Sequence, residues 1–201
     1  LPGVQTLPVM RPGSALGTGD LEVRLVAGPP VVGEIGVDNH GSRYSGEVRV
    51  RAAVAVNHPF MLGDQLTASA LKTDANLWLG SLGYARPLGT DGLRASAAWS
   101  RTAYALRQGF EGNEGTAESG SLGVSYPLVR SQRANLLASV SWQEKTLFNS
   151  RVFGASTERY RIQGLPLAMS FDHRDTWGGA GVLSGVATFT RGYLDKADPA
   201  R

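Results

Sequence analysis

Apolar and polar residues alternate along most of this chain, and the alternation predicts a series of strands. It is clearest at residues 46–56, 119–127 and 134–144, where an apolar side chain occupies every second position. A period of two is typical of a strand with one apolar face and one polar face. The pattern predicts nine strands, at residues 31–38, 46–56, 65–72, 77–86, 93–105, 119–127, 134–144, 160–173 and 183–192.

Proline marks three of the predicted turns. Pro59, Pro87 and Pro127 each follow an alternating segment, and glycine, aspartate or serine lies close by. Proline lacks an amide hydrogen and fixes φ, so it is placed at the ends of strands, while glycine and aspartate favour turns. The chain therefore reads as a serial antiparallel meander.

The lengths of the strands and of the connections favour a membrane barrel. Several strands approach the roughly 9 to 11 residues that a tilted strand needs to cross a bilayer. The turns at 57–64, 87–92, 128–133 and 174–182 are compact, whereas the other rim includes longer connections at 108–117 and 145–158. This asymmetry is typical of outer-membrane barrels. Alternation alone also fits a soluble β-sandwich.

Two tyrosines near the short-turn rim have two interpretations. Tyr84 and Tyr126 fit the aromatic girdle that such barrels place at the membrane surface. Ordinary aromatic packing in a β core explains each of them equally well.

The first 28 residues contain two further strand candidates. Residues 4–10 and 21–27 are joined by a turn rich in proline and glycine at 11–19. Two strands do not make a stable domain. This segment is therefore expected to be the end of a larger unit or to pack against the strands that come after it.

Composition excludes several classes of protein. The 201 residues include 26 glycines and no cysteine, so disulfides and thiolate metal sites are excluded. The net charge of +3 comes from scattered residues, without the basic stripe that nucleic-acid binding requires. The first residues lack the basic start and apolar run of a signal peptide.

No catalytic, metal or cofactor site is predicted. His40, His58 and His173 lie far apart without a second ligand close to any of them. The run 172–175 reads as a charge cluster at a strand end, because adjacent strand residues point to opposite faces. The run 178–181 is rich in glycine but lacks the spacing of a phosphate-binding loop.

Several segments, in order along nearly the whole chain, resemble one known family. They include Asn57-His58-Pro59 with Leu62-Gly63-Asp64, and further motifs within 32–46, 82–93, 115–131 and 172–185. The chain resembles the haemolysin secretion/activation family, the TpsB transporters of two-partner secretion. These are related to the barrels that insert other outer-membrane proteins.

The resemblance implies an all-β fold, an antiparallel transmembrane β-barrel preceded by part of a periplasmic domain. Residues 1–28 would be the C-terminal part of a POTRA domain, and 29–201 the N-terminal portion of an outer-membrane barrel. Family barrels have more than nine strands, so the chain is expected to be a fragment. The run Thr190-Arg191-Gly192-Tyr193 is similar to the lumen-loop motif of the family, but it falls inside a predicted strand.

The implied function is transport, not catalysis. Family members pass a large unfolded exoprotein (TpsA-like, such as a haemolysin or adhesin) through the barrel, and they secrete or activate it. The partners would be that exoprotein and outer-membrane lipid, with no nucleotide, nucleic acid or cofactor. Alternation assigns six polar residues to the lumen: Glu47, Arg49, Arg51, Ser139, Ser141 and Gln143. The alternatives are an outer-membrane protein insertion factor and a soluble β-sandwich binding domain.

Overall fold

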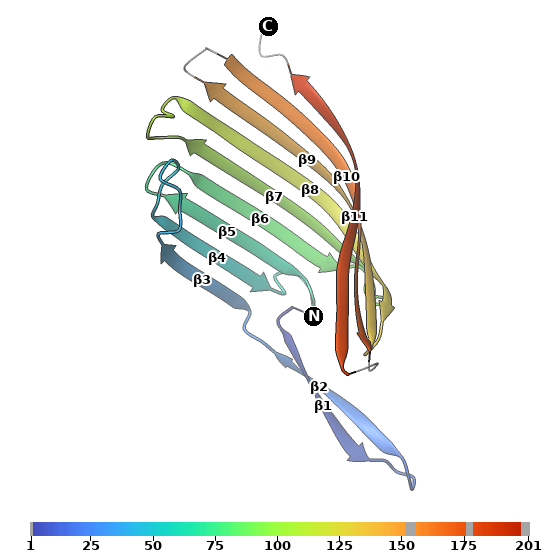
Figure 1. Ribbon diagram of the computed structural model, residues 1–201. Helices are drawn as coiled ribbons and strands as arrows, with labels where there is room; N and C mark the ends of the chain where they lie inside the picture. Colours follow the sequence, from blue (N-terminus) through green and yellow to red (C-terminus); the bar gives the residue numbers. More distant parts are fainter. Residues whose placement is uncertain (1, 152–155, 176–178, 198–201) are drawn as a thin grey trace.

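The computed structural model describes residues 2–151, 156–175 and 179–197, and these residues form β-strands joined by turns (Figure 1). Among them, no helix is long and apolar enough to cross a membrane. The strands are β1 (Val4–Pro12), β2 (Gly19–Ala27), β3 (Val31–Asp38), β4 (Arg49–Asn57), β5 (Gln65–Thr73), β6 (Trp78–Pro87), β7 (Arg94–Ala105), β8 (Asn113–Arg130), β9 (Ala134–Arg151), β10 (Ser156–Asp175) and β11 (Gly181–Ala197).

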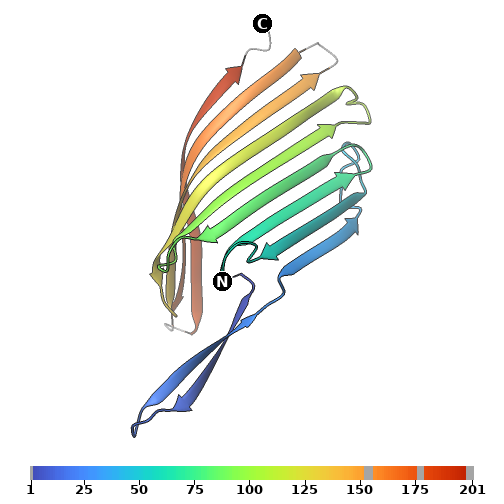
Figure 2. The same ribbon diagram turned by 180° about the vertical axis from the view of Figure 1, so that it is seen from behind.

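Nine of these strands form one antiparallel sheet in sequence order, from β3 at one edge to β11 at the other. This confirms the predicted meander. The sheet is tilted and curls into an open part of a barrel, as both views show (Figures 1 and 2). β1 and β2 form a separate hairpin, which extends beyond the rim that carries the β4–β5 and β6–β7 turns.

The last four strands are longer than the sequence predicted. β8 begins at Asn113, inside the predicted loop at 108–117, and β9 continues to Arg151, inside the predicted loop at 145–158. Residues 152–155 of the latter lie outside the described residues. Alternation could not reveal these extensions, because residues 113–119 carry small or polar side chains on both faces, while in the β9 extension the neighbours Leu147 and Phe148 are apolar on both faces.

Three other details of the prediction were wrong. β4 begins at Arg49, not at residue 46, because Gly46 adopts φ 108° within the preceding connection. Pro127 lies inside β8, beside a register shift that falls between Pro127 and Val129. The rims also differ less than expected: only the 39–48 connection is longer than every connection on the compact rim.

The large sheet is a single layer and has no conventional core. Among the described residues, Ala75 is the only hydrophobic residue that is buried. The described residues, the β1–β2 hairpin included, expose forty large hydrophobic side chains, and in a β-sandwich a second sheet would hide those of the large sheet. No second layer covers them in the described part of the chain, so this arrangement does not fit a soluble sandwich.

The most deeply buried polar group stabilises the β4–β5 turn. Asp64 has no exposed surface. Its Oδ2 accepts hydrogen bonds from the backbone amides of Phe60 and Met61, at 3.3 and 3.2 Å, and from the Tyr84 hydroxyl at 2.8 Å. A carboxylate that accepts several bonds fixes a turn, because each donor would be costly to leave unpaired in a buried place.

We expect Asp64→Ala to destabilise the complete protein by about 1 to 3 kcal/mol, because the substitution leaves buried donors unpaired. The free energy of unfolding can be measured in urea after refolding into detergent micelles. Asp91→Ala is the matched control, since Asp91 lies in the exposed β6–β7 turn and its removal should change the free energy little. Equal effects of the two substitutions would contradict the role given to Asp64.

Candidate functional site

The pairing register keeps each face of the sheet continuous from β4 to β9. Residues paired across neighbouring strands lie on the same face. Starting from the last residue of β4, successive partners are Asn57, Gln65, Ala85, Ser96, Gly123 and Ser141. We call the face that these residues share the polar face, and the opposite one, which includes Val54, Leu82 and Trp99, the apolar face.

Five of the six residues predicted for the lumen lie on the polar face. The register places Arg49 and Arg51 of β4 on the same face as Ser139, Ser141 and Gln143 of β9. They do not form one cluster, because four strands separate β4 from β9 in the sheet.

The sixth predicted residue, Glu47, lies outside the strands. It precedes β4, and its carbonyl oxygen accepts a hydrogen bond from the Gly41 amide at 3.0 Å. The period of two therefore does not assign Glu47 to a face. Glu47 was predicted to line the lumen because the predicted strand began at residue 46, three residues too early.

The two arginines share one carboxylate that sequence analysis did not select. The Arg49 Nε atom lies 2.7 Å from Asp38 Oδ1, and an Arg51 terminal nitrogen lies 3.5 Å from Asp38 Oδ2. Asp38 is directly opposite Arg49 in the β3–β4 ladder. The signal was present in the sequence, since Asp38 ends one strand and Arg49 opens the next, but only the register shows that they meet.

A row of serines crosses the polar face. Ser69 of β5 and Ser81 of β6 lie with their hydroxyl oxygens 2.7 Å apart, and those of Ser100 in β7 and Ser119 in β8 lie 2.8 Å apart. Ser81 is also paired with Ser100, so the four residues are consecutive cross-strand partners. Because serine side chains are small, they project little from this part of the face, and their hydroxyl groups can donate and accept hydrogen bonds.

Aligned serines were the signal that sequence analysis missed. Each strand from β5 to β8 carries a serine on the polar face, but single serines are common in any sequence. Their alignment depends on the register, which the turn lengths and the hydrophobic pattern determine together.

The apolar face carries most of the large hydrophobic side chains of the sheet, and they are exposed. They include Val50, Leu82, Trp99, Leu122, Val124, Trp142, Leu167, Met169 and Phe189. Leu167, for example, retains 51% of its accessible surface. Monomeric soluble proteins rarely expose so continuous an apolar surface, so this face is suited to an apolar environment outside the protein.

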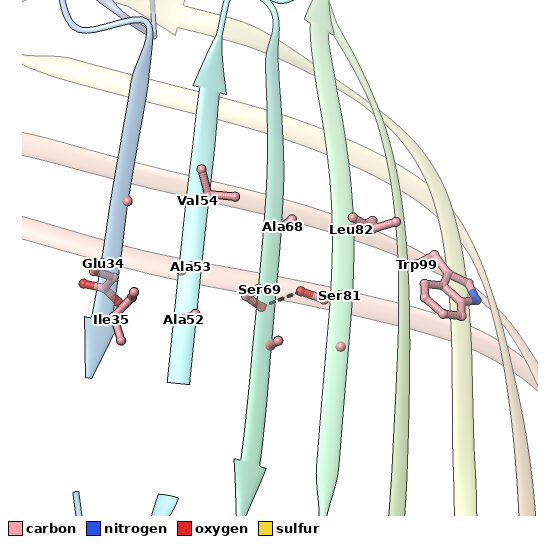
Figure 3. A pocket seen from close by; sticks show the side chains of 13 residues that line it. Glu34, Ile35, Ala52, Ala53, Val54, Ala68, Ser69, Ser81, Leu82 and Trp99 are labelled. Atoms are coloured by element: carbon pink, nitrogen blue, oxygen red, sulfur yellow. Dashed lines mark hydrogen bonds between the residues drawn. The ribbon is translucent and has the colours of Figure 1, made fainter. Parts of the chain in front are cut away.

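A hollow of about 750 Å³ lies on the apolar face of β3 to β7. Figure 3 shows larger side chains around it, including Ile35, Val54, Leu82 and Trp99. Alanine and glycine, together with Glu34, Ser69 and Ser81, complete its lining. The hollow is thus a shallow depression with a mainly apolar lining, which fits flexible hydrocarbon better than a polar ligand.

Aromatic and charged residues mark the margin of the apolar face that lies nearer the rim with the 39–48 connection. The Trp99 indole nitrogen donates to Glu118 at 2.8 Å, and beyond Trp142 the next residue on this face is Glu144, which lies 3.4 Å from Arg161. One row of cross-strand partners crosses this margin: it runs from Leu82 through Trp99 and Gly120 to the charged Glu144. A row of partners is expected to cross the margin in this way when the strands are tilted relative to the barrel axis and the apolar band is perpendicular to that axis.

The 172–175 run divides between the two faces of the sheet. Asp172 lies on the polar face and accepts a hydrogen bond from Asn135 at 2.9 Å, whereas His173 pairs with Ala134 and Leu183 on the apolar face. Within the described residues, no group of three histidine, aspartate or glutamate side chains is placed to hold a metal ion. Thr190–Tyr193 lie inside β11, in ladder with β10.

The sheet resembles solved structures that have the same fold. CdiB from Escherichia coli superposes with a TM-score of 0.61 at 17% identity, over 88% of this chain and 37% of that one. CdiB from Acinetobacter baumannii superposes with a TM-score of 0.62 at 16% identity, over 95% of this chain and 37% of that one. These similarities support the fold, a partial antiparallel β-barrel.

Sequence comparison gives a relative and a family. The heme/hemopexin transporter protein HuxB of Haemophilus influenzae (strain 86-028NP) is 23% identical over 172 residues, which cover 84% of this chain and 30% of the relative. The chain therefore corresponds to about a third of the proteins it matches. The family model of the haemolysin secretion/activation protein ShlB/FhaC/HecB matches residues 17–193. With a continuous two-faced sheet and a family match over most of its length, the chain belongs to the haemolysin secretion/activation (ShlB/FhaC/HecB) family.

Proposed function

We propose that this chain is part of an outer-membrane transporter that secretes a large exoprotein by two-partner secretion. One observation carries the proposal: a single sheet keeps one polar and one apolar face in register over nine strands, and the described residues bury almost no hydrophobic side chain. Family membership supports transport as the activity. No step of the proposal requires an enzymatic group, a nucleotide, a nucleic acid or a cofactor.

The apolar face would contact outer-membrane lipid. Strands that span a bilayer carry an outward apolar band with aromatic residues at both margins. Tyr84 and Tyr126 lie on this face toward the compact rim, and Trp99 and Trp142 lie near the margin where charged residues begin. The two tyrosines would therefore belong to the girdle nearer the compact rim.

The polar face would line the path of the exoprotein. Serines and the Asp38–Arg49–Arg51 group offer hydrogen bonds and charge to water and to an extended peptide. Fewer large apolar side chains point from this face than from the apolar face, so an unfolded chain would find less hydrophobic surface to bind there. Arg49, Arg51, Ser139, Ser141 and Gln143 would be lumen residues in this arrangement.

The β1–β2 hairpin would belong to a periplasmic POTRA domain, with residues 1–28 as its C-terminal part. The hairpin projects from the rim with compact turns, which in outer-membrane barrels faces the periplasm (Figure 1). Its two strands have unpaired outer edges among the described residues, and such an edge can accept an extended peptide as an added strand. The exoprotein would thus meet the protein on the periplasmic side.

Secretion is tested by deleting the gene for the complete protein in a strain that also expresses its candidate exoprotein. We expect the exoprotein to disappear from the medium, while other outer-membrane proteins keep their normal levels. Restoring the gene should restore secretion. Loss of many outer-membrane proteins with unchanged export would contradict the proposal and favour an insertion factor instead.

The lumen assignment is tested with neighbouring cysteines, because the chain has none of its own. Ser141→Cys on the polar face should react with a water-soluble maleimide, and Val140→Cys on the apolar face should react with a lipid-restricted reagent. The two positions are adjacent in β9, so depth in the membrane is nearly the same for both. Equal labelling of both cysteines by both reagents would exclude the assignment.

A further inference from the structure

The hairpin joins the sheet through very few contacts. Within the described residues, β1 and β2 pack against each other but not against any strand of the large sheet. The connection consists of Gly3 and the linker from Gly28 to Pro30, which meet the end of β4. The direction of the hairpin therefore depends on this small region.

One residue, Asn57, holds the linker through its backbone amide and its side chain. The backbone amide of Asn57 donates to the Pro30 carbonyl at 2.7 Å, and its side-chain Nδ2 donates to the Pro29 carbonyl at 3.0 Å. Asn57 Oδ1 in turn accepts from Gln65 Nε2 at 2.9 Å. Proline has no amide hydrogen, so the carbonyl is the only backbone group through which each of these prolines can be held.

The start of the hairpin packs against the same side chain. Gly3 has φ 65°, and a Cβ atom at this position would lie 2.5 Å from the Asn57 Cβ. The Gly28 amide donates to the Gly3 carbonyl at 2.9 Å, which closes the base of the hairpin. Both chain segments that leave the hairpin thus converge on Asn57, which is only 8% exposed.

Several hydrogen bonds cross-link the turn that follows Asn57. His58 has φ 57°, its Nδ1 accepts from the Gly63 amide at 2.8 Å, and its own amide donates to the Asp64 carbonyl at 3.0 Å. The Asp64 carboxylate holds the tip of the same turn. Because buried hydrogen bonds fix the position of the group that makes them, this turn provides a firm base for Asn57.

We propose that Asn57 is a positioning residue that locks the hairpin at a fixed angle to the rim of the sheet. Asn57 lies on the polar face, so the lock is placed at the mouth of the proposed lumen. The inference rests on the proposed function for its purpose: a substrate-receiving hairpin held at one angle presents an exoprotein to the same opening each time. The lock itself is a structural statement that can be measured without secretion.

The test measures the hairpin angle in the complete protein, refolded into micelles. Spin labels are placed at Leu16→Cys, in the fully exposed hairpin turn, and at Asp91→Cys, in the exposed β6–β7 turn. Pulsed electron paramagnetic resonance should give one narrow distance distribution. Asn57→Ala should abolish the single narrow peak, while heat-modifiable migration on a gel shows that the barrel remains folded. Asn39→Ala, at an exposed position on the opposite rim, should leave the peak unchanged.

A second variant guards against misfolding. Asn57→Asp keeps an acceptor for Gln65 but cannot donate to the Pro29 carbonyl, so it should also lose the narrow peak. A narrow, unshifted peak in both Asn57 variants would overturn the proposal. If the unmodified protein shows the peak but exports nothing, the proposed function fails while the lock stands, so the two results are separable.

Discussion

The antiparallel hydrogen-bond ladder is the constraint on which the rest of the structure depends. Side chains alternate with a period of two, so slipping any one strand by one residue would exchange its faces. From β4 to β9 the polar row from Asn57 to Ser141 passes through every strand without such an exchange. A single layer can therefore present a continuous polar face on one side and a continuous apolar face on the other.

The absence of a buried core among the described residues is a consequence of that arrangement. Burial of apolar area is the main favourable term in the folding of a soluble protein. Here the hydrophobic side chains of the apolar face remain exposed, so their stabilisation has to come from the surroundings. The aromatic residues beside the charged margin, Trp99 and Trp142, fit a boundary between hydrocarbon and water.

Much of the fold could be predicted from the sequence, and the errors have physical causes. The nine strands and their order were predicted from period-two alternation, and five of six proposed lumen residues do share a face. Strand ends were less predictable: β8 extends into a segment where both faces are small or polar, the β9 extension has the apolar neighbours Leu147 and Phe148 on opposite faces, and Glu47 lies outside β4. Groups formed across strands, such as Asp38 with Arg49 or the serine row, required the register. In the sequence Asn57 is only part of a motif, because its bonds to the linker depend on tertiary structure.

The central claim is that the apolar face contacts lipid, and tryptophan fluorescence tests it most directly. In the complete protein, reconstituted into vesicles, every tryptophan except Trp142 is replaced by phenylalanine, and brominated acyl chains serve as quenchers. The account predicts strong quenching of Trp142 and weak quenching after the tryptophan is moved one position, with Trp142→Phe and Ser141→Trp. Weak quenching of Trp142 by brominated lipid, together with strong quenching by aqueous acrylamide, would contradict it.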